Sequence, residues 1–257
     1  MIRRVVDSPF ERSKDAVNRL EAGWAIPGLP YPPMITERRF DTVRKCTRAA
    51  AWAMVAELRA AVRDRGAATL AVSGGRTAKH VLPFLAVSEL AWHRVTVTLA
   101  DDRWVRRGHP DSNEGLARRY LLKDRAAKAA FVRLKTVSTT PAAGLKQAES
   151  WVRDMEWPLD VIFLGMGEDG HVASLFPGED WSGGKRLVAV PATDGRQPRG
   201  SLSPSALVDV RHVFLVISGA AKTETYVRAC EPGPAEELPV RLVLHQDRVP
   251  VSVFLAS

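Results

Sequence analysis

Cysteine is scarce in this 257-residue sequence, and long apolar runs are missing from it. Cys46 and Cys230 lie far apart without the spacing of metal ligands, so the sequence indicates neither a disulfide framework nor a zinc site. No apolar run approaches the roughly 18 residues that a membrane span needs, and the N-terminus lacks the apolar core of a secretory signal. We therefore expect a soluble protein of the reducing cytoplasm that contacts no membrane.

Basic residues outnumber acidic ones, and the formal net charge of +8 favours anionic partners. Either a phosphorylated metabolite or a nucleic acid would satisfy this charge. The basic residues are scattered, however, with no long basic tract and no recognisable nucleic-acid module, which is typical of solvated helix faces. We therefore expect no nucleic-acid partner. The hydrophobic content of 46% suffices for a full core.

The first 35 residues differ in composition from the rest of the chain. Residues 1–33 mix charges with several prolines and show no sustained periodicity apart from a short helix predicted around Ala16 to Ala22. We predict that residues 1–35 form a partly irregular extension lying over the surface of one α/β domain at 36–257. From Val43 to Val62, apolar residues recur at helical spacing, and Gly66 is the predicted end of that helix.

Predicted strands and helices alternate along the domain. Pro83 is expected to strain the first of the later helices. The predicted strands are 69–72, 95–99, 159–164, 187–190, 213–217 and 251–255, and the later helices are 81–90, 112–122, 142–155 and 220–229. This alternation predicts a single open, mainly parallel sheet that is covered by helices on both faces.

The segment 159–178 is the most informative part of the chain. A mostly apolar run at 159–164 predicts a buried strand, and it ends abruptly in the pattern G-x-G-x-D-G-H. Ligands of open α/β sheets bind beyond the carboxyl ends of the strands, so Asp169 and His171 are predicted to enter a site. Histidine exchanges protons near neutral pH. The alternative is a glycine-rich turn whose histidine merely caps a helix.

Three other predicted strands end in polar residues. Ser73, Gly74, Gly75 and Thr77 follow the strand at 69–72, where glycines let a phosphate approach backbone N–H groups at a helix N-terminus. A tight turn that needs glycine for its geometry is the alternative.

Charged residues mark the remaining strand ends. Asp101, Asp102 and Arg103 follow the strand at 95–99 and are costly to bury unless they are paired or bind a ligand. Ser112 and Asn113 are expected to cap the next helix. Lys222 lies in the first turn of a predicted helix, where its repulsion by the helix dipole costs roughly 0.3–1 kcal/mol; a bound phosphate would reverse this cost. The alternative is that Lys222 is a solvated lysine, and that Arg199 is an ordinary arginine of a surface loop.

Five motifs in order carry a resemblance to a known family. They are SGGRT at 73–77, DDRWV at 101–105 with SN at 112–113, LGMGEDGHVASLFPG at 164–178, PRGSL at 198–202 and SGAAK at 218–222. From about residue 36 to its end, the chain resembles the 6-phosphogluconolactonase family, whose superfamily includes glucosamine-6-phosphate deaminase. The resemblance implies a Rossmann-like fold and hydrolysis of 6-phospho-D-glucono-1,5-lactone to 6-phosphogluconate in the oxidative pentose phosphate pathway. It implies no obligatory metal or organic cofactor.

The resemblance also implies roles for individual residues. Those implied to bind the substrate and its phosphate are Ser73, Gly74, Gly75, Thr77, Asn113, Arg199 and Lys222. His171 is implied to perform the proton chemistry with support from Asp169 and Asp101, while Arg103 faces the substrate.

As a mechanism, we expect His171 to take a proton from water that attacks C1 and to return it to the leaving ring oxygen. Asp101 or Asp169 would orient the imidazole. Arg103, or backbone N–H groups of the turn 165–170, would meet the oxyanion.

The chain departs from the family pattern at four positions. Arg76 and Ala78 replace Ser and Pro, Asp102 replaces Glu, and Ser201 replaces Thr. Arg76 matters most, because an added cation beside the phosphate loop would tighten anion binding or obstruct the usual pose.

Two rival functions use the same scaffold. A deaminase or isomerase would carry an acidic residue within 173–178, and this segment has none. A non-catalytic sugar-phosphate sensor would need a helix-turn-helix segment, for which residues 1–35 are too short and proline-rich. We expect a monomer or a weak dimer.

Overall fold

The computed structural model describes residues 2–6 and 35–256. Within these ranges, parallel strands form one large sheet in the order β1-β2-β11-β10-β7-β3-β4-β6. The strands are β1 (Ile2–Val6), β2 (Ile35–Phe40), β3 (Ala68–Val72), β4 (Val95–Leu99), β6 (Ala130–Phe131), β7 (Leu159–Leu164), β10 (Val210–Ser218) and β11 (Val251–Ala256). The predicted mainly parallel α/β fold is confirmed.

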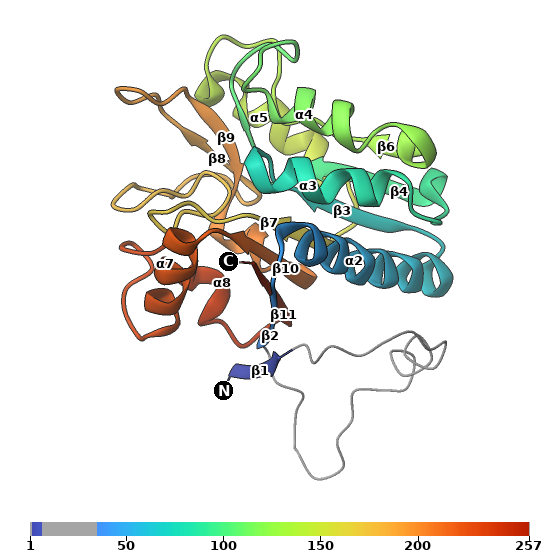
Figure 1. The fold of residues 1–257 in the computed structure, drawn as a ribbon. Coiled ribbons are helices and arrows are strands. Elements are labelled where there is room, and N and C mark those ends of the chain that lie inside the picture. The colour runs from blue at the N-terminus through green and yellow to red at the C-terminus, as the bar shows by residue number, and fades with distance from the viewer. Residues whose placement is uncertain (1, 7–34, 257) are drawn as a thin grey trace.

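Helices cover both faces of this sheet. The described α-helices are α2 (Val43–Arg65), α3 (Gly75–Ala86), α4 (Asn113–Tyr120), α5 (Pro141–Arg153), α6 (Pro204–Leu207), α7 (Ala220–Cys230) and α8 (Arg241–Leu244). The crossovers through α2 and α3 run toward the β6 edge, whereas the crossover through α7 runs toward the β1 edge. Right-handed crossovers therefore place α7 on the face opposite α2 and α3. In Figure 1, β10, β11 and β2 lie between α7 and α8 on the left and α2 on the right.

The core lies where α2 packs on the central strands. Its buried stripe includes Cys46, Ala50, Met54 and Leu58, as the helical spacing predicts. Thr42 caps the first turn by accepting a hydrogen bond from the N–H of Lys45, and Gly66 ends the helix with a φ of 79°.

Strand β7 is buried along its whole length. Its one charged side chain, Asp160, accepts a hydrogen bond of 2.8 Å from the N–H of Thr69 and pairs with Arg65 at the end of α2. The carboxylate is therefore satisfied at the amino end of the strand, and the carboxyl end remains apolar up to the glycines.

Helix α3 begins and ends earlier than the predicted helix at 81–90. It ends at Ala86, so Leu90 lies beyond it. Pro83 lies inside the helix and has no N–H to donate to the carbonyl of Lys79 four residues earlier. Lys79 is exposed, so water can replace that bond.

A second, antiparallel sheet of three strands lies beside the first. It is formed by β5 (Asp101–Arg103), β9 (Arg199–Leu202) and β8 (Leu187–Val190), in that order. The strand predicted at 187–190 forms, but it pairs here rather than in the parallel sheet. Arg199 belongs to a strand and its side chain is 14% exposed, so the expectation of a surface-loop arginine is wrong.

The N-terminal residues add an edge to the large sheet. Strand β1 pairs in parallel with β2, with Ile2 opposite Ile35. The helix predicted around Ala16 to Ala22 lies outside the described residues, and the division into an extension at 1–35 and a domain at 36–257 stays a prediction. Among the described helices, none is both long and apolar enough to cross a membrane.

Candidate active site at the carboxyl edge of the sheet

The polar ends of the central strands lie side by side. The N–H of Ser73 donates to the carbonyl of Phe163 at 3.0 Å, and the N–H of Ala100 donates to the carbonyl of Val72 at 2.9 Å. Thr77 Oγ1 and Ser218 Oγ lie 3.3 Å apart and join the start of α3 to the end of β10. The segments after β3, β4, β7 and β10 therefore meet at one edge, as predicted.

The loop after β7 is a tight glycine turn. The N–H of Gly167 donates to the carbonyl of His171 at 2.9 Å, and the N–H of Gly170 donates to the carbonyl of Gly167 at 3.2 Å. A Cβ on Gly167 would lie 2.1 Å from His171 Nδ1 and 2.3 Å from Asp169 Oδ1. Glycine at 167 is therefore what lets the side chains of Asp169 and His171 fold back over the turn.

Asp169 is the carboxylate that contacts His171. Its Oδ1 lies 2.6 Å from His171 Nδ1 and also accepts the His171 N–H at 3.2 Å. Burial raises the pKa of Asp169, but its hydrogen bond to His171 and the attraction between their charges lower it by more, so the net shift is downward. With Nδ1 engaged by a carboxylate, Nε2 is the imidazole nitrogen left to exchange a proton with a ligand.

Phe176 and Arg196 complete the surroundings of His171. The Phe176 ring packs 4.6 Å from the imidazole, and Arg196 Cζ lies 3.9 Å from the Phe176 ring centre. Arg196 also pairs with Glu179. Neither residue is predicted as a site residue from the sequence, because a phenylalanine in a loop and a scattered arginine carry no motif of their own.

Asp101 lies in a different network, with its side chain 6% exposed. Its Oδ2 accepts a 2.5 Å hydrogen bond from Ser174 Oγ and lies 3.5 Å from Arg199 Nη1, while Oδ1 accepts from Asn113 Nδ2 at 3.1 Å. Burial lowers the pKa of Arg199, and the charges of Arg103 and Arg196 lower it further against the opposing charge of Asp101. Asp101 thus holds the guanidinium of Arg199 in the site.

Asn113 links this network to the diglycine loop. Its Oδ1 accepts a hydrogen bond from Arg103 Nη1 at 3.1 Å, and a Cβ on Gly74 would lie 1.8 Å from that same oxygen. Ser112 is the residue that caps α4, by accepting from the N–H of Gly115 at 3.1 Å. The expectation that Asn113 acts as a cap is therefore wrong, because its side chain turns into the site.

Cations and unpaired donors belong to several of the segments at this edge. Lys222 is in the first turn of α7, where burial lowers its pKa and the charge of Arg76 lowers it further, against Glu168 and Asp169. Within the described part of the chain, buried side-chain atoms without a hydrogen-bond partner include Ser73 Oγ and the Nε atoms of Arg103, Arg196 and Arg199. Unpaired buried donors beside cations favour an anionic ligand.

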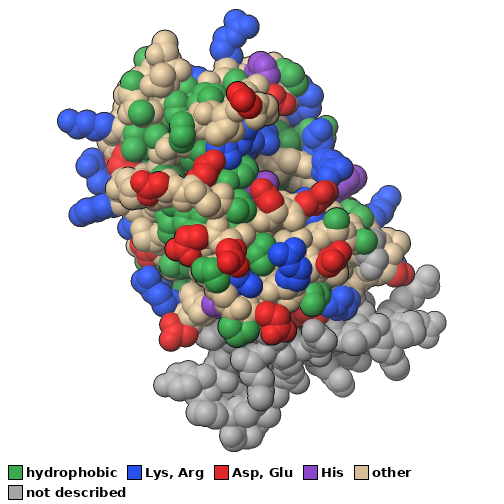
Figure 2. Space-filling view, turned by 90° about the vertical axis from the view of Figure 1, so that its left-hand side faces the viewer, with side chains coloured by type: hydrophobic (Ala, Val, Ile, Leu, Met, Phe, Trp, Pro, Cys, Tyr) green, Lys and Arg blue, Asp and Glu red, His purple; other side chains and the backbone are tan. Residues whose placement is uncertain are grey.

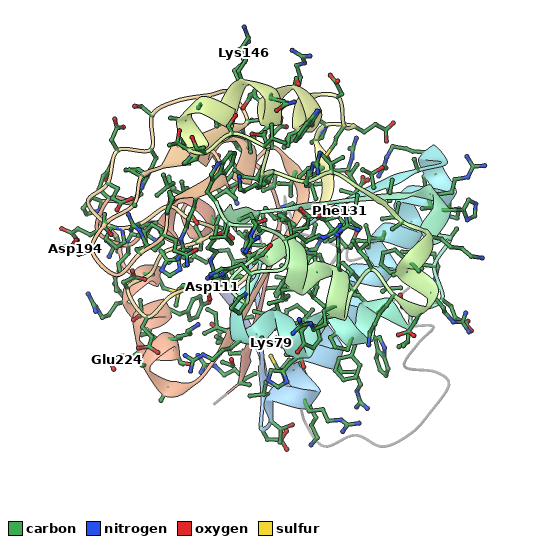
Figure 3. All side chains as sticks on the ribbon, turned by 90° about the horizontal axis from the view of Figure 1, so that it is seen from above. Lys79, Asp111, Phe131, Lys146, Asp194 and Glu224 are labelled. Carbon is green, nitrogen blue, oxygen red and sulfur yellow. The ribbon has the colours of Figure 1, made fainter. Side chains whose placement is uncertain are left out.

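The surface views agree with this arrangement. Figure 2 shows Lys and Arg side chains gathered in a hollow across the upper half of the face that carries α7, with acidic side chains around them. Seen from above, Asp111 lies between Asp194 and the helix that bears Lys79 (Figure 3). Gln197 Nε2 donates a hydrogen bond to Asp111 Oδ2 at 3.0 Å. The loop that precedes Asn113 therefore contacts the loop that precedes Arg199.

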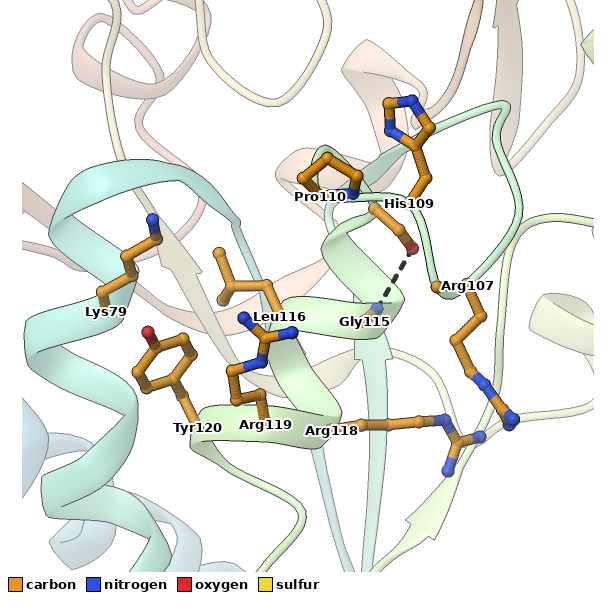
Figure 4. Close-up of a pocket in the computed structure, with 11 residues that line it drawn as sticks. Lys79, Arg107, His109, Pro110, Gly115, Leu116, Arg118, Arg119 and Tyr120 are labelled. Atoms are coloured by element: carbon orange, nitrogen blue, oxygen red, sulfur yellow. Dashed lines mark hydrogen bonds between the residues drawn. The ribbon is translucent and has the colours of Figure 1, made fainter.

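A separate basic pocket of about 430 Å³ lies between α3 and α4 (Figure 4). Its lining includes Lys79, Arg107, Arg119 and Tyr120, and neither His171 nor Lys222 belongs to it. This pocket is therefore distinct from the convergent site. Among the described residues, no group of three His, Cys, Asp or Glu side chains is placed to hold a metal ion.

Comparisons with known proteins identify relatives. The model of the family described as glucosamine-6-phosphate isomerases/6-phosphogluconolactonase matches residues 41–251. A 6-phosphogluconolactonase of Pseudomonas aeruginosa is 34% identical over 89% of this chain and 98% of its own length, and one of Rhizobium meliloti is 38% identical over 78% and 90%. The crystal structure of a 6-phosphogluconolactonase from Shewanella baltica, 36% identical, has a TM-score of 0.83 over 86% of this chain and 97% of that one.

The stability of the fold should depend on pH through Asp102. Burial raises its pKa from 3.8 to about 7, although the N–H groups of Asn113 and Glu114 act against this shift. The folded chain then holds more protons than the unfolded chain between those two values. The free energy of unfolding therefore falls as pH rises through this window, by up to about 1.4 kcal/mol per pH unit, and the contribution is constant above it.

Asp102→Asn should remove this slope. The measurement is the free energy of unfolding of the variant minus that of the unsubstituted chain, from urea titrations at several pH values. This difference should rise from pH 4.5 to pH 7 and then stay level. A difference that is the same at every pH would contradict the assignment.

Proposed function

The chain belongs to the family of glucosamine-6-phosphate isomerases and 6-phosphogluconolactonases, and we propose that it is an enzyme that hydrolyses 6-phospho-D-glucono-1,5-lactone to 6-phospho-D-gluconate in the oxidative pentose phosphate pathway. The observation that carries this proposal is the 2.6 Å contact between His171 and Asp169 beside a group of cations. This contact supports a general base, and the neighbouring cations support a site for the phosphate of the substrate.

His171 is the proton carrier of the proposed mechanism. Asp169 holds Nδ1, so Nε2 takes a proton from the water that attacks C1 and later returns it to the leaving ring oxygen. Asp169 also stabilises the imidazolium that forms between the two steps. Its own lowered pKa keeps it ionised while it does so.

The oxyanion that forms at the lactone carbonyl needs a donor. The N–H groups of Gly167 and Gly170 are used within their own turn. Arg103 has a buried Nε without a partner among the described residues, and Asn113 and the carbonyl of Asp111 hold its Nη1. Arg103 is therefore the donor we assign to the oxyanion, with Asn113 as the residue that positions it.

The phosphate lies at the N-termini of α3 and α7 in this proposal. Ser73, Gly74, Gly75 and Thr77 supply backbone and hydroxyl donors, and Lys222 and Arg199 supply charge. Asp101 acts here by orienting Arg199, at 3.5 Å, rather than by contacting the histidine. These contacts fix the carbonyl against the base, which lowers the entropic part of the barrier.

We further propose that the protein acts in the cytoplasm as a monomer or weak dimer, without a nucleic-acid partner. Cys46 and Cys230 are not joined in a disulfide, which is what we expect in a reducing compartment. Large exposed apolar side chains of the described surface, such as Trp52, Val137 and Val227, lie on separate elements.

The function is tested by following freshly generated 6-phosphogluconolactone with and without the protein, because the lactone also opens spontaneously. We expect consumption well above the spontaneous rate, with no ammonia released from glucosamine 6-phosphate. Ammonia release without lactone hydrolysis would favour the deaminase. Binding of 6-phosphogluconate without turnover of either substrate would favour a sugar-phosphate sensor.

His171→Ala should abolish most of the chemistry while leaving binding intact. Loss of a general base costs about 10²–10⁴-fold in rate. We expect kcat to fall by that factor, whereas the Kd of 6-phosphogluconate measured by calorimetry changes little. An unchanged kcat would remove His171 from the mechanism.

Gly167→Ala tests the turn that positions the base. The added methyl group would overlap His171 Nδ1 and Asp169 Oδ1, so both side chains would have to move. Moving a catalytic group by about 1 Å costs about 10²-fold in rate. Gly165→Ala is the matched control, because a Cβ there has no atom within 4 Å. If both variants lose activity equally, the contact between His171 and Asp169 is not what the turn protects.

A further inference from the structure

Arg76 connects the two loops that form the proposed site. It follows Gly75 in the first turn of α3, and its Nη2 lies 3.7 Å from Oε1 of Glu168 in the histidine loop. The side chains are 85% and 63% exposed. This pair joins the loop proposed to bind phosphate to the loop that carries the base.

Lys222 lies within the field of both partners. The charge of Arg76 lowers the pKa of Lys222 and the charge of Glu168 raises it, in addition to the larger effect of burial. The site without ligand thus holds two neighbouring cations at its phosphate side, and Glu168 offsets part of their repulsion. A phosphate dianion would offset more of it, because it carries more charge and three acceptor oxygens.

The backbones around Arg76 are already fixed. Thr77 Oγ1 lies 3.3 Å from Ser218 Oγ, and Thr225 Oγ1 donates to the carbonyl of Glu168 at 2.7 Å. These contacts hold the starts of α3 and α7 and the histidine loop together. A change of partner by Arg76 therefore needs only a rotation of its own side chain.

The ion pair itself is weak. Exposed pairs contribute at most about 1 kcal/mol, and 3.7 Å is long for a direct hydrogen bond. An arginine fork on a phosphate is the stronger interaction. Glu168 can therefore hold Arg76 in the absence of substrate without preventing its transfer.

We propose that Arg76 is a second, exchangeable phosphate ligand: Glu168 holds its guanidinium in the empty site and releases it to the phosphate of the bound sugar. This inference rests on the proposed function and extends it to a residue where the family pattern has serine. Arg76 thereby increases the preference for a phosphorylated lactone over an unphosphorylated one, and Glu168 limits that preference by competing for the same guanidinium.

The test is a double-mutant cycle of Arg76→Ser and Glu168→Gln. The readouts are the Kd of 6-phosphogluconate by calorimetry, and kcat and KM for 6-phosphogluconolactone and for glucono-1,5-lactone. Arg63→Ser is the control, because it removes the same charge from a 72% exposed arginine near the end of α2, where neighbouring Arg65 pairs with Asp160 at the amino end of β7.

Arg76→Ser should raise Kd and KM for the phosphorylated ligands about tenfold, the low end expected for a hydrogen bond to a charged group, with kcat unchanged. Neither variant should alter kcat/KM for glucono-1,5-lactone. Glu168→Gln should tighten 6-phosphogluconate binding about threefold, as expected for an exposed ion pair, but only while Arg76 is present. Arg63→Ser should leave all these constants unchanged.

Two results would overturn the inference while leaving the function intact. One is lactone hydrolysis with the same Kd and KM in Arg76→Ser as in the unsubstituted chain. The other is tightening by Glu168→Gln that persists in the double variant, which would mean that Glu168 repels the phosphate directly. An unsubstituted chain that neither hydrolyses the lactone nor binds 6-phosphogluconate would overturn both the inference and the proposed function.

Discussion

The strands of the large sheet are parallel, so each one ends at the same edge and the chain must leave that edge through a loop. Where a loop leads directly into a helix, the first N–H groups of that helix have no partner and its positive dipole end points outward. Helices α3 and α7 both begin this way after β3 and β10, and the contact between Thr77 and Ser218 brings their starts together. The preference of this edge for an anion is therefore a consequence of topology before any side chain is considered.

The small antiparallel sheet converts this edge into a shaped site. Strand β5 leaves β4 at Ala100 and pairs with β9, which places Asp101 opposite Ser201 and brings Arg199 within reach of Asp101. Asn113 then fills the space that Gly74 leaves open and holds Arg103. The polar groups from four distant segments are thus buried together because backbone pairing supports them, since isolated charges would not stay buried.

The sequence predicts those helices and strands whose apolar residues follow a recognisable pattern. The buried stripe of α2 and the mostly apolar run of β7 indicate their own structure, and the glycine motif after β7 indicates a site at its end. Strands β5 and β9 were not predicted, because the short segments Asp101–Arg103 and Arg199–Leu202 have no alternation and become strands only through the pairing of β9 with β5 and β8. The sequence likewise leaves open whether Asp101 or Asp169 contacts His171. That choice depends on how the turn at Gly167 folds, and the spacing of residues along the chain does not predict this.

The charges of the proposed site do not balance within the site itself. Arg76, Arg103, Arg196, Arg199 and Lys222 face Asp101, Asp169, Glu168 and Glu179, and several guanidinium Nε atoms stay buried without a partner among the described residues. Burial lowers the pKa values of Arg199 and Lys222, so holding these cations in the site destabilises the folded chain. In the proposed function, a phosphate dianion would offset this excess charge and accept hydrogen bonds from the unpaired donors. In that proposal, phosphate binding would reduce the cost of holding these cations together, and attraction of the substrate would not depend on a charge on the base.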